Sequence, residues 1–256
     1  MSTDTSPTNA LSDTLLERYV EQFFGFGRWG AKIWFVGIEE AGGWEFTDAK
    51  RRLTEWEKRR ERPLEDAPVF YPACGNKRWH GTGATVQKTW RQLIRMLLLA
   101  RGKPDTEDAI LDYQRTRLGA AEDETCLAEL LPLPSPNIGA WKYNQWSSLP
   151  WLQSRDLYLS KNLQRRAKSL RQQIADHKPK VVVFYGTTLP GRTSLLPYWS
   201  QIADGRFEQA IKTGKILLRR KTNEIVFFVT RHPTSETDDY FKKIGRFFRD
   251  EHRDLF

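Results

Sequence analysis

Residues 32–38 read Lys-Ile-Trp-Phe-Val-Gly-Ile, a nearly continuous apolar run that stops at a glycine. A run of this kind is typical of a strand that is covered on both faces, as in the middle of a parallel sheet. Residues 180–186, Lys-Val-Val-Val-Phe-Tyr-Gly, have the same pattern and form the clearest buried strand of the chain. Two more strands are expected at 125–131 and 224–230, and a further one at 215–220 around a turn at 222–223.

The segments between these strands have apolar residues at helical spacing. It predicts helices over 11–24, 46–62, 84–101, 106–118, 157–177 and 236–252. Strands that alternate with helices favour a three-layer α/β/α fold with a central, mainly parallel four-stranded sheet. The long segments 63–83 and 132–154 are rich in Pro or Gly and polar residues, and are expected to be mostly loop. We therefore expect a disordered tail at 1–10 and a single α/β domain at 11–256.

The composition excludes several classes of protein. The longest apolar runs are far short of the roughly 20 residues that span a bilayer, so no membrane partner is expected. Two cysteines, Cys74 and Cys126, are too few for a Cys₄ zinc or iron–sulfur site within one chain. The start of the chain lacks the basic and apolar regions of a secretory signal, and together with the few cysteines this favours a cytoplasmic location. No cofactor or metal is expected.

Positive charge is concentrated in the last two-fifths of the chain. Residues 151–256 contain 21 Lys and Arg residues against 11 Asp and Glu residues, whereas residues 1–150 contain 20 against 21. A basic surface of this kind suits a polyanion such as DNA, although a high isoelectric point is also common among proteins that bind none.

Four loops follow the carboxyl ends of the expected strands, at 37–43, 132–137, 186–192 and 231–236. In open α/β sheets ligands bind at this edge, so the four loops are expected to meet at one cleft. The first loop brings Glu39 and Glu40, and the last brings His232. The first loop has neither the G-x-G-x-x-G nor the G-K-[ST] pattern of nucleotide-binding loops. Its acids suit general-base chemistry or stabilisation of a developing cation, unless they cap the helix that follows.

Four motifs in this order resemble those of the uracil-DNA glycosylase superfamily, over most of the chain from about Lys32 to His252. They are Gly37-Ile38-Glu39-Glu40-Ala41, the Pro-rich stretch that begins Glu129-Leu130-Leu131-Pro132-Leu133, the strand Val181-Val182-Val183-Phe184-Tyr185-Gly186, and His232-Pro233-Thr234-Ser235. The resemblance implies an enzyme that flips a damaged base, typically uracil, out of DNA and hydrolyses its N-glycosidic bond in base excision repair.

The resemblance also assigns roles to residues. Glu39 falls on the position of the water-activating acid or amide, and His232 on that of the histidine that donates to the base. Base binding is assigned to Gly37, Ile38 and Glu40, with Glu129 at the position where relatives read uracil with an Asn. Asn144 is an alternative base reader. The aromatic floor under the base is expected at His80, with Trp79, Phe70 and Tyr71 as substitutes.

DNA contacts are expected from Thr234 and Ser235, from Lys142 and Arg192, and from the basic residues 165–171. Uracil-containing DNA is the expected partner, and we expect a monomer. Two alternatives stay open at this point. One is a DNA-binding member of the same fold that has lost catalysis. The other is a nuclease that holds a divalent cation between Glu39, Glu40 and Glu129.

Overall fold

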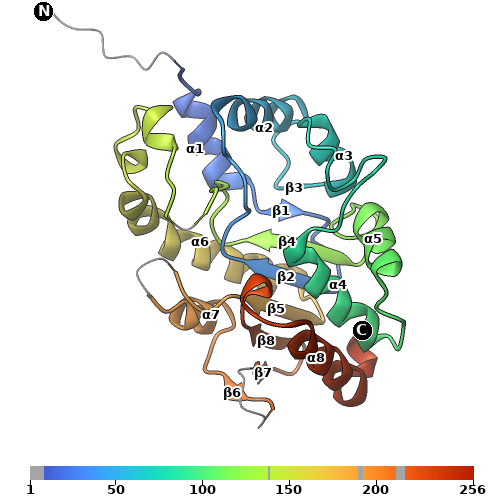
Figure 1. Ribbon diagram of the computed structural model, residues 1–256. Helices are drawn as coiled ribbons and strands as arrows, with labels where there is room; N and C mark the ends of the chain where they lie inside the picture. Colours follow the sequence, from blue (N-terminus) through green and yellow to red (C-terminus); the bar gives the residue numbers. More distant parts are fainter. Residues whose placement is uncertain (1–8, 138, 190–192, 212–216) are drawn as a thin grey trace, which may run out of the picture.

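A computed structural model of the protein describes residues 9–137, 139–189, 193–211 and 217–256. Within these residues one mixed sheet contains eight strands (Figure 1). They are β1 (Gly25–Phe26), β2 (Ile33–Gly37), β3 (Leu64–Glu65), β4 (Thr125–Glu129), β5 (Val181–Tyr185), β6 (Glu208–Gln209), β7 (Leu217–Lys221) and β8 (Val226–Thr230). Their order across the sheet is β3-β1-β4-β2-β5-β8-β7-β6.

The four central strands, β4, β2, β5 and β8, are parallel to one another. Every residue in them is buried, which explains why they are mostly apolar rather than alternating; the buried polar exceptions are Thr125, Glu129 and Thr230. The α/β class is therefore confirmed. The expected count of four strands is wrong, because short strands extend the sheet at both edges, and β1, β7 and β6 run antiparallel to their inner neighbours.

The edge strand β1 depends on a glycine. Gly25 has φ +141°, and a Cβ there would lie 1.9 Å from the carbonyl oxygen of Leu127 in β4. Only a residue without a side chain allows this close approach of two backbones. Strands β1, β3 and β6 contain two residues each, so no periodicity in the sequence can reveal them.

Helices cover both faces of the sheet. The α-helices are α1 (Asp13–Gln22), α2 (Phe46–Lys58), α3 (Ala67–Ala73), α4 (Lys88–Ala100), α5 (Glu107–Thr116), α6 (Arg155–His177), α7 (Leu196–Ile202) and α8 (Asp238–Glu251). Short 3₁₀ turns are η1 (Tyr143–Gln145), η2 (Pro150–Leu152), η4 (Pro233–Ser235) and η5 (Arg253–Leu255). Helices α4 and α8 pack together on one face, and α6 and α7 on the other (Figure 1).

The six expected helices are present, with ends shifted by a few residues. The expectation of a long loop at 63–83 is wrong in part, because β3 and α3 lie there and Phe70 of α3 is fully buried. Helix α7 had no counterpart in the sequence analysis. The expected tail at 1–10 falls, up to residue 8, outside the described residues. Within the described ranges, no helix is long and apolar enough to cross a membrane.

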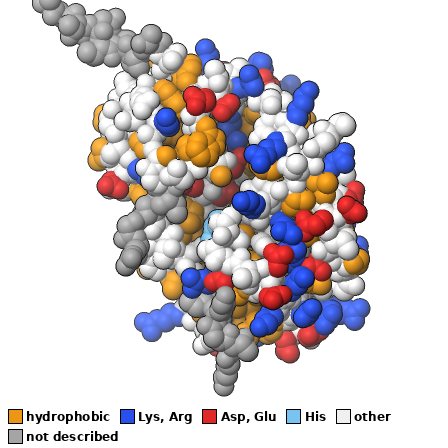
Figure 2. Space-filling model, viewed as in Figure 1, with side chains coloured by type: hydrophobic (Ala, Val, Ile, Leu, Met, Phe, Trp, Pro, Cys, Tyr) orange, Lys and Arg blue, Asp and Glu red, His pale blue; other side chains and the backbone are white. Residues whose placement is uncertain are grey.

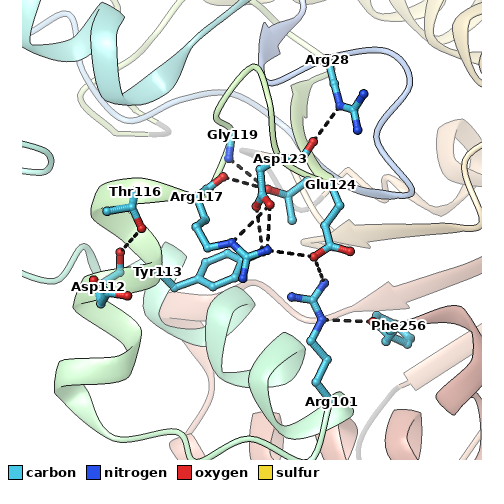
Figure 3. A network of polar contacts seen from close by, with 11 residues as sticks. Arg28, Arg101, Asp112, Tyr113, Thr116, Arg117, Gly119, Asp123, Glu124 and Phe256 are labelled. Atoms are coloured by element: carbon cyan, nitrogen blue, oxygen red, sulfur yellow. Dashed lines mark hydrogen bonds and ion pairs between the residues drawn. The ribbon is translucent and has the colours of Figure 1, made fainter.

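A polar network fastens the sheet at the edge where its parallel strands begin (Figure 3). Glu124, the residue before β4, accepts from Arg101 at 2.6 Å and from Arg117 at 3.2 Å. Arg117 also binds Asp123 at 2.9 Å, and Arg101 donates to the backbone oxygen of Phe256 at 3.1 Å. The network ties α4, the end of α5 and the C-terminal residue to the start of β4, which leaves the opposite edge free for a binding site.

Candidate functional site

A cavity of about 490 Å³ lies at the carboxyl ends of the four central strands. Its lining comes from residues 38–41 after β2, 135–137 after β4, 186–189 after β5 and 231–232 with 234–235 after β8, together with Arg155 from α6. The expected convergence of four loops is thus confirmed. Figure 2 shows a hollow on this face of the molecule with a histidine side chain beside it.

Backbone hydrogen bonds hold the first two loops together beyond the strands. Leu131 N donates to the oxygen of Ile38 at 2.7 Å, and Ser135 N donates to the oxygen of Glu40 at 3.0 Å. In return, Gly42 N donates to the oxygen of Ser135 at 3.2 Å. The Pro-rich loop is therefore fixed against the acidic loop, and both form one rigid wall of the cavity.

Glu39 enters the cavity as half of an ion pair. Its Oε1 accepts from Nη2 of Arg155 at 2.6 Å, and each of the two side chains is only 9% exposed. Oε2 is buried and has no hydrogen-bond partner among the described groups. Burial raises the pKa of Glu39 in spite of Arg155. An unpaired buried carboxylate oxygen is costly, so a water or ligand that reaches Oε2 after a small side-chain rotation would be bound favourably.

Glu40 points away from Glu39. It forms an ion pair with the buried guanidinium of Arg52 and accepts from the hydroxyl of Tyr71 at 2.5 Å. It therefore anchors the loop to α2 and α3 while its residue still borders the cavity. Tyr71 is committed to this contact, which removes it as a floor for a base, and Phe70 lies in the core.

His232 is held in one orientation by the residues that follow it. Its Nδ1 lies 2.8 Å from Oγ1 of Thr234 and accepts from the Thr234 N–H at 3.3 Å. Burial lowers the pKa of His232, so the ring is neutral near pH 7. Because Nδ1 accepts, the proton of the neutral ring is assigned to Nε2, which makes Nε2 a donor.

Ser235 completes this loop: its N–H and its hydroxyl donate to the backbone oxygen of His232, at 2.9 and 2.8 Å. Thr234 and Ser235 line the cavity, but their polar groups already position His232. Gly186, with φ +93°, supports the same geometry, because a Cβ there would lie 3.2 Å from Ile38 and 3.6 Å from the His232 ring.

Glu129 does not line the cavity, which corrects the expectation that it would read the base. It pairs with Gly37 in the sheet, and its carboxyl occupies the space that a side chain on Gly37 would fill. A Cβ on Gly37 would lie 2.5 Å from Glu129 Oε2 and 2.3 Å from the Tyr185 hydroxyl. That hydroxyl donates to Glu129 Oε1 at 3.2 Å. Burial, with Glu40 nearby, raises the pKa of Glu129 well above its usual value, which favours the neutral carboxylic acid at this position beneath the cavity.

Other predicted contacts also lie elsewhere. His80 packs against Tyr71 and Trp90, with ring centroids 5.4 and 5.5 Å apart, and burial lowers its pKa to about 4. It is part of an aromatic cluster and does not line the cavity. Asn144 is exposed on η1, two residues after Lys142, and neither residue borders the cavity. Arg192 lies outside the described residues.

Three basic residues of α6 are engaged within the protein. Arg165 pairs with Glu21, and Arg171 pairs with Asp204 at 2.9 Å. Arg166 is 1% exposed and donates to four backbone carbonyl oxygens. Lys168 is exposed, so this helix offers a smaller free cationic surface than its sequence suggested.

A groove of about 370 Å³ adjoins the cavity and shares Glu40 and Ala41 with it. We call it the adjoining groove; its other lining residues include Trp44, Arg51, Arg78 and Trp79. Trp44 is 56% exposed, and the guanidinium of Arg78 lies 4.5 Å from the centre of the Trp79 ring. Figure 2 shows Lys and Arg side chains spread over this side of the molecule.

Sequence reasoning missed Arg155 and the adjoining groove. Arg155 is the first residue of α6 and meets Glu39 from 116 positions away, so no local pattern could have joined them. No protein-family model and no curated protein sequence matches this chain.

Proposed function

We propose that this protein binds DNA and hydrolyses the N-glycosidic bond of a flipped-out uracil or related deaminated base. One observation carries the proposal: Glu39 and a neutral, donor-bearing His232 enter the same cavity from the ends of β2 and β8, on either side of β5. The cavity falls within the size range of small-molecule sites, about 300–1,000 Å³.

The reaction needs a carboxylate beside the sugar and a hydrogen-bond donor beside the base. Cleavage builds positive charge on the sugar and negative charge on the leaving base. The Glu39 carboxylate stabilises the sugar cation and orients a water whose oxygen adds to C1′. Nε2–H of His232 donates to the base oxygen on which negative charge develops, as a preorganised oxyanion contact. The water proton finally goes to the released base, so that a free base and an abasic site remain.

Arg155 has a positioning role in this reaction. Its bond to Oε1 orients the Glu39 carboxylate, and a small side-chain rotation brings the buried, unpaired Oε2 to the water. The positive charge of Arg155 also favours the ionised form of Glu39 against the effect of burial.

The adjoining groove gives the DNA strand next to the flipped base a place to bind. Exposed Trp44 offers an aromatic face on which a neighbouring base can stack, and Arg51 and Arg78 offer cations for phosphates. This path does not need contacts from Lys142, or from the exposed Thr234 and Ser235.

The geometry of the three acids favours the glycosylase over the nuclease alternative. Glu39 and Glu40 are each bound to an arginine, and Glu129 is buried beneath Gly37. Among the described residues no group of three His, Cys, Asp or Glu side chains has the geometry to hold a metal ion.

The proposal is tested by incubating the protein with single- and double-stranded oligonucleotides that contain uracil or hypoxanthine, followed by alkali to break the strand at abasic sites. The wild type is expected to cut at the modified base. Glu39→Gln and His232→Ala should each lower the rate by about 10²-fold or more. Glu45→Gln and His177→Gln, both exposed on the surface, are the matched controls and should retain full activity. DNA binding without release of any base would identify instead a binding protein of the same fold.

A further inference from the structure

Arg155 is a buried arginine with unused hydrogen-bond donors, and it lines the cavity. Its Nη2 donates to Glu39, but its Nε and Nη1 have no hydrogen-bond partner among the described residues. The guanidinium carbon lies 5.8 Å from the centre of the Trp141 ring. A guanidinium carries five N–H donors and no acceptor, so most of its donors are unpaired.

Among the described residues, the two arginines that are more deeply buried than Arg155 are not left in this condition. Arg166 donates to four carbonyl oxygens, and Arg95 is bound by Asp105, Asp238 and Gln92. Leaving buried donors unpaired is unfavourable, because each loses its hydrogen bonds to water without gaining new ones. Arg155 borders the cavity, but its Nε and Nη1 are themselves buried, so a side-chain rotation brings them to a ligand that supplies the missing acceptors.

The geometry of the guanidinium limits what that ligand is. Nη2 has two hydrogens, one on the edge it shares with Nε and one on the edge it shares with Nη1. Whichever of these hydrogens Glu39 accepts, the other edge keeps two parallel donors. Such an edge binds a carbonyl oxygen, or a carbonyl oxygen beside a ring nitrogen, and has nothing to offer to an amino group.

We propose that Arg155 recognises the flipped base and makes the site specific for bases that carry a carbonyl where the parent base carries an amino group. The inference rests on the function proposed above. Uracil offers O4 where cytosine has an amino group, and hypoxanthine offers O6 beside N7 where adenine has an amino group. Deaminated bases are therefore accepted and their parents rejected, because the amino group would face donors only. Arg155 thus takes over the reading that Glu129 does not perform.

The size of the effect follows from hydrogen-bond matching. A bidentate arginine contact discriminates between bases by about 1–3 kcal/mol, roughly 5- to 150-fold. We expect the wild type to prefer the deaminated member of each pair by this factor. A methionine at 155 keeps the length of the side chain but has no donor, so the preference should fall to less than about 3-fold.

The test measures binding, so that it does not depend on cleavage. Oligonucleotides carry one 2′-fluoro-2′-deoxynucleotide, with uracil, cytosine, hypoxanthine or adenine as the base, because the fluorine suppresses the sugar cation and prevents release. Dissociation constants are measured for the wild type, Glu39→Gln and the double variant Glu39→Gln/Arg155→Met. The double variant removes both members of the ion pair, so no buried charge is left alone. Arg155→Lys, which keeps the charge without the planar edge, should be intermediate.

Glu39→Gln is expected to keep the preference for uracil over cytosine and for hypoxanthine over adenine, and the double variant is expected to lose it. If the double variant keeps the preference, Arg155 does not read the base, while cleavage by the wild type would still support the proposed function. If the wild type shows the preference but releases no base, the proposed function fails and the reading by Arg155 stands. Equal binding of all four bases by the wild type overturns the inference outright.

Discussion

The substitution Glu129→Gln distinguishes between two possible roles of Glu129, a buried neutral acid and a carboxylate that reads the base. Gln has nearly the same shape as Glu and can keep the hydrogen bond from Tyr185 to the side-chain oxygen. Burial holds the pKa of Glu129 well above its usual value, so the folded protein keeps a proton that the unfolded chain loses above pH ~4.3. The variant should therefore fold at pH 7 with no loss of stability.

The pH dependence of the free energy of unfolding gives the size of the expected effect. A raised acid pKa in the folded state contributes stability that is complete below the unfolded pKa and is lost as the pH rises toward the folded pKa. In that interval the folded state binds one more proton, and the free energy of unfolding falls by about 1.4 kcal/mol per pH unit. Gln cannot titrate. As the pH rises from the unfolded pKa toward the folded pKa of Glu129, the stability of the wild type should therefore fall relative to Glu129→Gln, with a slope of up to about 1.4 kcal/mol per pH unit.

The assay is urea unfolding followed by tryptophan fluorescence at pH 5, 6 and 7. Glu122→Gln, at an exposed position, is the control and should follow the wild type at every pH. If the free energies of unfolding of the wild type and of Glu129→Gln changed with pH in the same way, Glu129 would be ionised in the folded state. That result would refute its placement as a neutral acid. A loss of uracil binding in Glu129→Gln would refute its placement beneath the cavity.

Three further predictions concern the DNA path, the reaction and the fold. Trp44→Ala should weaken binding of single-stranded DNA at least 5-fold in fluorescence anisotropy, since stacking of one base contributes about 1–3 kcal/mol, whereas Leu157→Ala, also half exposed, should not. In a pH profile of kcat/KM, the acid limb should lie above the usual glutamate range, because burial raises the pKa of Glu39 and the reaction needs its carboxylate. An acid limb that persisted unchanged in Glu39→Gln would contradict the assignment. Arg166→Met should cost about 3 kcal/mol in urea unfolding, because buried carbonyl oxygens lose their donor, and an unchanged midpoint would show that these bonds contribute little.

The central strands and the position of the cavity could be predicted from the sequence. Runs such as 181–185 are apolar because both faces of the strand are buried, and parallel strands bring their following loops to one edge. That is why Glu39 and His232 could be placed at one cleft before the structure was known. The direction in which the Glu129 side chain points could not be predicted, because it depends on the space above Gly37.

Contacts between distant segments were also beyond the reach of sequence patterns. The basic residues of α6 formed an obvious run, but Arg165 and Arg171 find acidic partners on α1 and after α7. Conversely, Arg155 looked like an ordinary helix start, and only the packing of α6 brings it to Glu39. Charge along a sequence therefore overestimated the cationic surface at α6 and overlooked the arginine inside the cavity.

The most direct measurement of the central claim is the release of a free base from DNA. A uracil-containing oligonucleotide is incubated with the wild type and with Glu39→Gln, and the reaction is analysed for free uracil and for alkali-labile abasic sites. The account predicts equal amounts of uracil and abasic sites with the wild type, and at least about 10²-fold slower formation of both with Glu39→Gln. Absence of free uracil with the wild type, or equal release by both proteins, would contradict it.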